Sequence, residues 1–358
     1  MTIHPIDLTL PWPGGVEAVR QCPVCSDPRR REECVGVRDG AFAAAPGQWN
    51  LQRCLGCEAL YLDPRPDRTS LHLAYRDYHT HAVTPPVDAF VARLRRALSN
   101  GYRNRLFATE TQPSLRVGAF LMPLFAGRAA HIRKEDRGLG RAGAPGMRVL
   151  DVGCGNGSFL AWARELGWGC YGVEIDPVAA GVARKLGVAI LGSEVRELGT
   201  EYAGSFDAIT LSHVIEHLYD PMEVLRQCWS LLKPGGSIWL ETPNTDSLGY
   251  EVYGSDWRGL EAPRHLVLFN TTSLRWSLEH AGFERVRVLP PADLLEPMFA
   301  VSAAMRLGRI AERDARPLPD EVRKEARRAA RRARRLLRRD AGKSEFITMM
   351  ARRPLVAG

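Results

Sequence analysis

Residues 149–160 read VLDVGCGNGSFL, and this stretch decides the fold. An apolar run ends at Asp151, three glycines follow at every second position, and a helical pattern comes next. Glycine adopts left-handed backbone conformations and leaves no side chain between the turn and a ligand. The helix that follows directs free N–H groups and a partial positive charge to the same place. The stretch therefore predicts a ligand-binding turn between a strand and a helix.

A second acidic residue indicates the kind of ligand. A dinucleotide fingerprint has the spacing G-x-G-x-x-G, whereas this turn has G-x-G-x-G, with Ser158 at the position of the third glycine. This difference disfavours NAD and FAD. Glu174 ends the next expected strand, in YGVEID, 23 residues after Asp151. That spacing suits a carboxylate that binds ribose hydroxyls, so we expect a nucleoside ligand.

Strands and helices alternate on both sides of the turn. This alternation predicts a parallel sheet with right-handed crossovers. The segment KPGG, at 233–236, is predicted to end a helix before the fifth strand. The expected strands are 148–152, 170–174, 189–191, 206–211, 237–241, 285–289 and 345–351, and the expected helices are 158–166, 177–186 and 222–232.

Four stretches in this order resemble the class I S-adenosylmethionine-dependent methyltransferases: VLDVGCGNGSFL, YGVEID, FDAITLSHVIEHLYDP and LLKPGGSIWLETPN. The resemblance covers about 148–290 and a last strand near 345–353. It implies an α/β fold with a Rossmann-like seven-stranded sheet whose last strand is antiparallel, and S-adenosylmethionine as the cofactor. The cofactor-binding residues that it implies are Asp151, Gly153, Gly155, Gly157, Glu174, Ile175, Ser193, Glu194, Ser212 and His213.

The candidate acid–base residues are histidines that follow the fourth and fifth strands. His213 ends the fourth strand, where ligands of open α/β sheets bind. His265 lies in a long excursion, YGSDWRGLEAPRHLVLF, and such an excursion in a compact fold is usually functional. We predict that His265 and His213 are catalytic, whereas His217 is interpreted as a structural histidine. Trp257, Arg258 and Arg264 would line the acceptor pocket, unless the excursion only packs its tryptophan on the sheet.

Two CxxC pairs precede the sheet, with 28 residues between them. Two such turns can place four thiolates around one ion, so the pattern predicts a structural zinc site of Cys22, Cys25, Cys54 and Cys57. Redox pairs are not expected twice in one small module, and disulfides are disfavoured in the cytoplasm. Zinc ribbons often have glycine after each second cysteine, where Ser26 and Glu58 stand here.

The segments CEALYLDPRPD and LAYRDYHTH resemble the N-terminal module of bacterial methyltransferases that carry a zinc ribbon. Many of these act in polysaccharide, glycolipid or natural-product assembly, which implies a hydroxyl acceptor on a saccharide, a glycolipid precursor or another small molecule. Tyr75, Tyr78 and His79 are candidates to reach the acceptor, with helix packing as the alternative. Two other hypotheses are an RNA methyltransferase and a non-catalytic S-adenosylmethionine-binding scaffold.

The expected domains are a zinc ribbon at 1–65, a helical connector on the acceptor side at 66–137, and a methyltransferase domain at 146–358. The last contains an Arg-rich helical insertion at about 292–342. The chain has 358 residues and a net charge of +8, and residues 301–358 hold 17 Lys/Arg against 7 Asp/Glu. Three interpretations of the Arg-rich helix are open. A solvated face is favoured most, a contact for anionic lipid comes second, and a nucleic-acid contact comes third.

The N-terminal sequence has no signal-peptide pattern, and the apolar runs are shorter than the ~20 residues that span a bilayer. We therefore expect a cytoplasmic protein without a transmembrane segment, with a possible peripheral contact at the inner membrane face through the Arg-rich helix. An Asn/Asp-Pro-Pro-aromatic run after the fourth strand, common in nucleobase amine methyltransferases, is absent from the sequence. Nucleic acid is therefore the less favoured acceptor.

Overall fold

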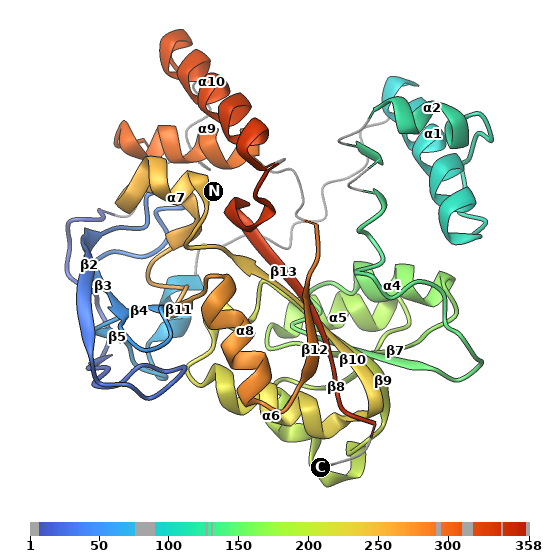
Figure 1. Ribbon diagram of the computed structural model, residues 1–358, viewed down its shortest axis with the longest axis horizontal. Helices are drawn as coiled ribbons and strands as arrows, with labels where there is room; N and C mark the ends of the chain where they lie inside the picture. The colour runs from blue at the N-terminus through green and yellow to red at the C-terminus, as the bar shows by residue number, and fades with distance from the viewer. Residues whose placement is uncertain are drawn as a thin grey trace. The chain divides into compact units, whose positions relative to one another are not determined.

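The computed structural model describes residues 7–75, 90–125, 128–129, 132–290, 295–309, 318–337 and 339–355. Its main element is a seven-stranded sheet with the order β12-β13-β10-β9-β6-β7-β8 (Figure 1). This order confirms the predicted Rossmann-like α/β fold. The strands are β6 Arg148–Val152, β7 Gly169–Val173, β8 Ala189–Gly192, β9 Phe206–Ser212, β10 Leu232–Pro243, β12 Glu284–Val288 and β13 Phe346–Arg352.

The sheet is parallel at its centre and antiparallel at its last strand. β6 pairs in parallel with both β7 and β9. The N–H of Gly235 donates to the carbonyl of Arg353, and the N–H of Asn244 donates to that of Glu345. Residues with higher numbers at β10 therefore pair with residues with lower numbers at β13, so the two strands run in opposite directions. The last strand is antiparallel, as predicted.

Helices α4, α5 and α6 connect the parallel strands, and their ends agree with the prediction within one residue. Asp176 begins α5, because its carboxylate accepts the N–H of Val178 at 2.8 Å and Pro177 follows it. α6 ends at Leu231, just before this segment, as predicted, but KPGG itself belongs to the strand instead of preceding it. β10 begins at Leu232, and Gly235 and Gly236 pair with Arg353. The helices are α4 Ser158–Glu165, α5 Pro177–Lys185, α6 Pro221–Leu231 and α8 Thr271–His280.

The described residues fall into two compact units. The first lies within Met1–His79, Ser212–Arg226 and Leu240–Ala351, and the second within Thr80–Leu211, Gln227–Trp239 and Arg352–Gly358. The first unit contains a second, four-stranded sheet of order β11-β4-β3-β2 and a two-stranded pair, β1-β5. These strands are β1 Val16–Glu17, β2 Arg30–Val37, β3 Trp49–Cys54, β4 Leu60–Leu62, β5 Arg65–Pro66 and β11 Val267–Leu268.

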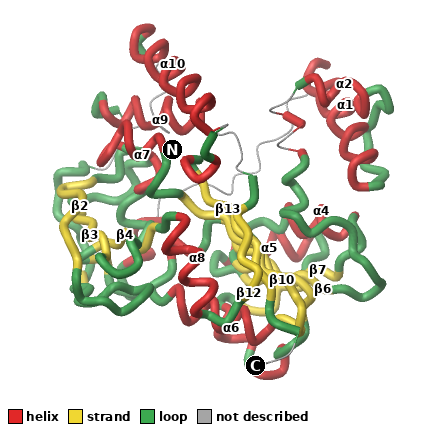
Figure 2. The backbone as a smooth tube through the Cα atoms, viewed as in Figure 1, coloured by secondary structure: helices red, strands yellow, loops and turns green. Residues whose placement is uncertain are grey.

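Three further helices belong to the first unit: α7 Leu248–Tyr253, α9 Leu295–Arg306 and α10 Asp320–Leu337 (Figure 2). α10 is the helix predicted from the Arg-rich insertion. Ala326, Ala330 and Ala333 are its buried residues and recur at helical spacing, which gives α10 a small-residue face. α10 and α9 are in contact. The charged side chains therefore occupy the remaining surface of α10.

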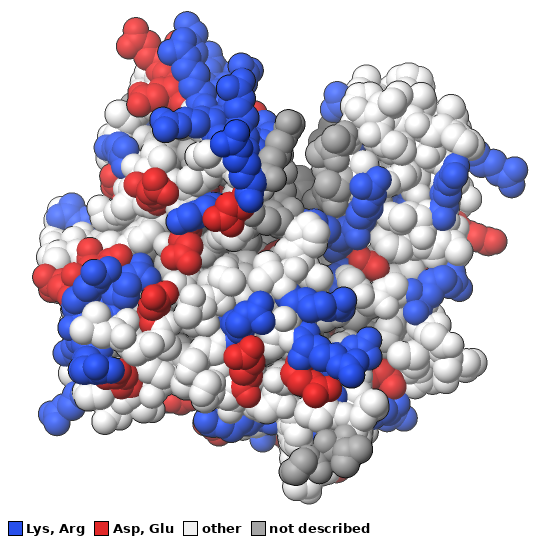
Figure 3. Space-filling model, viewed as in Figure 1, with Lys and Arg blue, Asp and Glu red and all other residues white. Residues whose placement is uncertain are grey.

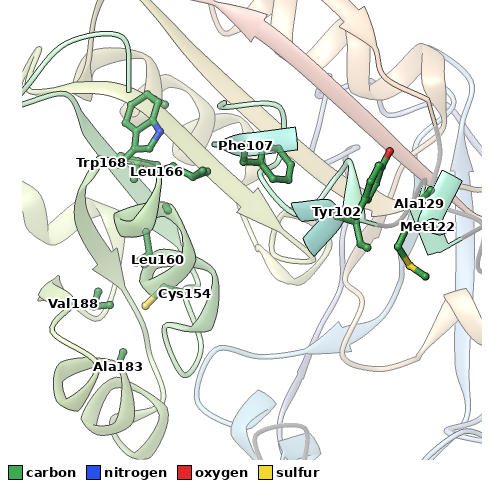
Figure 4. Packing of buried hydrophobic residues seen from close by; sticks show 14 residues of the cluster. Tyr102, Phe107, Met122, Ala129, Cys154, Leu160, Leu166, Trp168, Ala183 and Val188 are labelled. Carbon is green, nitrogen blue, oxygen red and sulfur yellow. The ribbon is translucent and has the colours of Figure 1, made fainter. Parts of the chain in front are cut away.

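The second unit has a core that joins the expected helical connector to the sheet. Tyr102 and Phe107 of α1 Phe90–Phe107 belong to one apolar cluster with Leu160 and Trp168 (Figure 4). A short helix, α2 Gly118–Leu121, packs closely on α1, since a Cβ at Gly118 would lie 2.0 Å from the carbonyl oxygen of Leu98. Glycine is required there by the close approach of two backbones.

Short 3₁₀ helices complete the described fold. Among the described residues, none of the helices combines the length and the apolar character that a membrane span needs. The 3₁₀ helices are η1 Leu71–Tyr75, η2 Met122–Leu124, η3 Val195–Leu198, η4 Thr200–Tyr202, η5 Ile215–His217, η6 Gly254–Asp256, η7 Arg258–Leu260 and η8 Ala341–Lys343.

Candidate functional sites

The glycine turn between β6 and α4 has the predicted backbone conformation. Gly153, Gly155 and Gly157 have φ angles of 67°, 56° and 78°, all in the left-handed region. The carboxylate of Glu174 lies against this turn. It accepts the N–H of Gly155 at 2.7 Å on one oxygen and that of Asp176 at 2.8 Å on the other. Each carboxylate oxygen has a second lone pair, which a ligand hydroxyl can use.

Gly157 serves packing as well as conformation. A Cβ at this position would lie 2.8 Å from the Cβ and 2.9 Å from the Cα of Ala183 on α5. Such distances are shorter than van der Waals contact, so only glycine lets the turn lie this close to α5. The third glycine of the motif is therefore explained by the contact with α5.

Asp151 is buried, and its Oδ1 is bound by Arg137 and Thr210. Its Oδ1 receives Arg137 Nη1 at 2.5 Å and the Thr210 hydroxyl at 2.6 Å. Burial raises the pKa of Asp151, while Arg137 opposes this rise. Arg137 also covers the ring of Phe159. The sequence offered no periodic or motif signal for Arg137, which lies just before the Gly-rich segment at 138–146.

The other predicted cofactor residues of the second unit line the ends of β7 and β8. Ile175 is 72% exposed beside the buried Glu174. An exposed apolar side chain next to a carboxylate fits the two halves of a nucleoside, a flat base and a polar sugar. Ser193 donates its N–H to Glu197 at 2.8 Å, and Glu194 pairs with Arg196 at 2.6 Å. Their contacts with a cofactor remain predictions.

His213 and Glu216 form a charged pair directly after β9, whose last residue is Ser212. His213 Nδ1 lies 3.3 Å from Glu216 Oε1, and its Nε2 lies 3.6 Å from Glu241 Oε1. Burial lowers the pKa of His213, but the two carboxylates outweigh burial and raise it to about 10. The ring is 41% exposed, so solvent weakens these interactions. His213 is therefore a cation at neutral pH.

His265 has the opposite environment. Burial lowers its pKa to about 4, so the ring is neutral at pH 7. Its Nδ1 lies 2.8 Å from the carbonyl oxygen of Gly259. The ring of His217 lies 4.8 Å away between centroids, and His217 Nδ1 lies 3.0 Å from the carbonyl oxygen of Arg264. The Tyr75 hydroxyl is 3.1 Å from the same Nδ1. Tyr78 and His79 lie outside the described residues.

The excursion that carries His265 is held by buried polar contacts. Trp257 is fully buried and donates Nε1–H to Glu345 at 2.8 Å. Arg264 is also fully buried, with Asp39 Oδ1 at 2.6 Å and Glu261 Oε1 at 3.0 Å from its guanidinium. Burial raises the pKa of Glu261, yet the neighbouring cations outweigh burial and lower it. Trp257 and Arg264 therefore fix the loop rather than present themselves at a surface.

The four cysteines of the two CxxC pairs converge in the first unit. Cys22 and Cys57 have their sulfurs 3.6 Å apart, and Cys25 and Cys54 have theirs 3.4 Å apart. All four sulfurs lie within 4.8 Å of one another. A disulfide needs about 2.05 Å, whereas Zn–S bonds of about 2.3 Å in a tetrahedron place sulfurs about 3.8 Å apart. The spacing fits four ligands of one ion.

The turns of this cluster explain the departure from the usual glycines. Ser26 and Glu58 follow the second cysteine of each pair and have φ angles of 61° and 66°. The left-handed conformation that glycine would supply is therefore present without glycine. The hydrogen bond from Cys57 lowers the pKa of Cys22 to about 6, and the same pairing raises that of Cys57. The four sulfurs lie close enough together to share one cation.

A family model and several known proteins match part of the chain. The family model described as "Methyltransferase domain" matches residues 126–288. The "Ubiquinone biosynthesis O-methyltransferase" of Xanthomonas campestris pv. campestris (strain B100) is 40% identical over 110 residues, which are 29% of this chain and 46% of that protein. The protein of the same name from Bordetella avium (strain 197N) is 32% identical over 153 residues, 39% of this chain and 63% of that protein.

A solved structure is also similar. The "SAM dependent methyltransferase from Archaeoglobus fulgidus" is 23% identical, covers 64% of this chain and 94% of its own, and has a TM-score of 0.42. The chain spans less than two thirds of the length of the curated relatives reported above. The sheet order, the glycine turn and the family match all indicate the same kind of domain. The chain contains a class I S-adenosylmethionine-dependent methyltransferase domain.

Proposed function

We propose that the protein transfers the methyl group of S-adenosylmethionine to a hydroxyl oxygen of a saccharide, a glycolipid precursor or another small molecule. The observation that carries the proposal is the turn of three left-handed glycines with the carboxylate of Glu174 against it. The likeness to relatives named O-methyltransferases supports an oxygen acceptor. The resemblance of the N-terminal module supports the saccharide.

The residues present fit the cofactor, and their contacts support the roles that we assign to them. S-adenosylmethionine supplies a methyl group already activated on positive sulfur. Glu174 and the glycine turn would bind the nucleoside, and Ile175 would cover the base. The acceptor oxygen would form the new C–O bond, the sulfur would keep the electrons of the broken S–C bond, and the hydroxyl proton would need an acceptor. His265 has a neutral ring for this proton, whereas His213 is already protonated and acts as a fixed positive charge.

Calorimetry with S-adenosylhomocysteine tests the cofactor site. We expect binding by the wild-type protein and a loss of about 2–3 kcal/mol for Glu174→Gln, because the turn and the ribose lose a charged acceptor. Glu201→Gln is the matched control, since Glu201 is an exposed glutamate of the same unit. A silent titration with the wild-type protein would overturn the assignment.

A parallel methyl-transfer screen tests the acceptor. Labelled S-adenosylmethionine is offered with nucleotide-sugars, lipid-linked glycans, phenols and RNA. Label in a sugar hydroxyl supports the proposal, whereas label in RNA alone replaces it with the nucleic-acid hypothesis. His265→Gln should abolish turnover and retain cofactor binding. The control is His280→Gln, because His280 is an exposed histidine at the end of α8.

We also propose that Cys22, Cys25, Cys54 and Cys57 hold a structural zinc ion, because four protein ligands leave no open coordination position. The ribbon at 1–65, the connector at 66–137 and the methyltransferase domain at 146–358 with its insertion at 292–342 are then the functional parts of the chain. Elemental analysis of the purified chain tests the site. One zinc per chain, lost in Cys54→Ser, is expected; a full zinc content in Cys54→Ser would contradict the ligand set.

The Arg-rich helix is proposed to contact anionic lipid at the inner face of the membrane, from a cytoplasmic protein. Arg327, Arg331 and Arg335 are exposed along α10, and blue side chains gather along it in the upper left of Figure 3. Each basic residue near an anionic surface contributes about 1 kcal/mol. Sedimentation with phosphatidylglycerol vesicles should capture the protein and release it at high salt. Equal capture by neutral vesicles would contradict the proposal.

A further inference from the structure

We infer that Glu216, His217 and His265 form a binding site for a divalent transition-metal ion, separate from the four cysteines. One ligand atom of each residue lies within 4.8 Å of the others. Glu216 is fully buried and His265 is 5% exposed. Two imidazoles and one carboxylate are a known ligand set for first-row divalent ions, with further positions left open.

Both histidines are held in the form that a metal requires. Nδ1 of His217 faces the carbonyl oxygen of Arg264 at 3.0 Å, and Nδ1 of His265 faces that of Gly259 at 2.8 Å. A carbonyl only accepts hydrogen bonds, so both Nδ1 atoms carry the proton. The Nε2 atoms then have lone pairs directed away from these carbonyls. Metal-binding histidines usually donate their other N–H in this way.

The carboxylate is positioned by its own neighbours. The Thr242 hydroxyl donates to Glu216 Oε2 at 3.0 Å, and His213 Nδ1 lies 3.3 Å from Oε1. A carboxylate oxygen accepts more than one bond, so these contacts orient Glu216 without excluding an ion. Such neighbours are typical of metal sites.

The backbone fixes the distance between the two segments that supply the ligands. Glu216 and His217 belong to η5, and His265 immediately precedes Leu266. The N–H of Leu266 donates to the carbonyl of Glu216 at 2.7 Å. Val267 and Leu268 then pair with Tyr61 and Leu60 in the four-stranded sheet. The three ligands are therefore preorganised.

The ion gives the proposed methyl transfer a way to activate its acceptor, and this role rests on the proposed function. A hydroxyl bound to the ion would lose its proton to water more easily, as water does on a bound divalent ion. Its oxygen would then form the C–O bond while the sulfur keeps the electrons of the broken S–C bond. Nε2 of His265 would be a ligand of the ion and could not also accept the proton, so in the metal-bound protein the ion would replace His265 as the group that activates the hydroxyl.

Binding of Mn²⁺ to the full chain tests the site, since Mn²⁺ prefers oxygen and nitrogen ligands and does not suit the four cysteines. The protein is dialysed against a weak chelator and titrated with Mn²⁺, and the electron paramagnetic resonance signal of free Mn²⁺ is followed. We expect one ion per chain, at least tenfold weaker binding in Glu216→Gln, and loss of binding in the double variant His217→Gln/His265→Gln. His280→Gln should bind as the wild type does. Retained binding in the double variant would overturn the site.

A second measurement needs no variant and covers the case of a variant that misfolds. Mn²⁺ broadens nearby proton signals, so the ring signals of His217 and His265 should disappear before those of His280. Equal broadening of all three, or none at millimolar Mn²⁺, would refute the inference. Titration with S-adenosylhomocysteine in the same samples reports the cofactor site separately, so failure of the metal site and failure of the proposed function are distinguished.

Discussion

In the second unit, Gly155 donates to Glu174 across 19 positions of the chain, whereas in the first unit Arg264 binds Asp39 across 225 positions. The turn is built from backbone groups within one strand–helix–strand segment. The histidine segment is built from buried side chains that distant parts of the sequence supply. The first arrangement needs glycine and correct spacing, and the second needs the whole unit to fold.

This difference predicts different kinds of sensitivity. A backbone-built site fails when a side chain or a strained conformation is introduced. A site held by buried charges fails when one partner is removed, because the other charge is left without compensation in a low dielectric. Substitutions in each site, and the titration of His213 and His265, can separate these two kinds of failure.

The largest effect is expected for Asp39→Asn. Asp39 is buried, accepts the N–H of Ala44 at 2.8 Å and binds the buried guanidinium of Arg264. Removal of its charge should lower the free energy of unfolding by about 3–5 kcal/mol. Asp220→Asn is the matched control, because Asp220 and Arg68 form an exposed pair worth about 0–1 kcal/mol. Chemical denaturation measures both, and equal losses would show that burial does not decide the strength of the pair.

A smaller loss is expected for Gly157→Ala. The new Cβ would meet Ala183, and φ of 78° adds strain, so the free energy of unfolding should fall by about 2–4 kcal/mol. Gly204→Ala separates the two causes. Gly204 has φ of 61°, but a Cβ there would have no atom within 4 Å. Its loss should be strain alone, about 1–2 kcal/mol. Thermal unfolding of both variants checks the difference, and a larger loss at Gly204 would contradict the packing argument.

The local features could be predicted from the sequence because each depends on neighbours in the chain. The glycine triplet, the spacing to Glu174 and the alternation of strands and helices need no knowledge of distant residues. The seven strands and the antiparallel last strand followed from the family resemblance, whereas the order of the strands came from the structure. The strand ends came out within one residue for most strands, while β10 began earlier because Gly235 and Gly236 pair with Arg353, directly after β13.

The contacts that hold the histidine segment could not be predicted. Nothing in the sequence around Asp39 marks it as the partner of Arg264, and Arg137 has no motif that links it to Asp151. Both pairs depend on tertiary folding, which brings together residues without a common periodicity. The convergence of Glu216, His217 and His265 has the same origin, since η5 and the segment before β11 meet only in the folded unit.

Opposite titration of two histidines gives the finest test of the comparison. The raised pKa of His213, about 10, means that its contacts with Glu216 and Glu241 stabilise the fold fully below pH 6.5 and are lost as the pH rises toward 10. The lowered pKa of His265, about 4, changes the stability of the fold in the opposite direction with pH. The unfolded chain takes up a proton below pH 6.5 that the folded chain refuses until about pH 4, so acid destabilises the fold through this residue.

Ring-proton NMR of the metal-free protein should therefore show His213 charged and His265 neutral at pH 7. In unfolding experiments, His213→Gln should flatten the loss of stability at high pH, and His265→Gln should flatten the loss below pH 6.5. The 41% exposure of His213 makes its effect the smaller of the two, because solvent screens its carboxylates. Two rings that both titrate near pH 6.5 would mean that the buried charges do not control this segment, and the distinction from the backbone-built turn would fail at its most sensitive point.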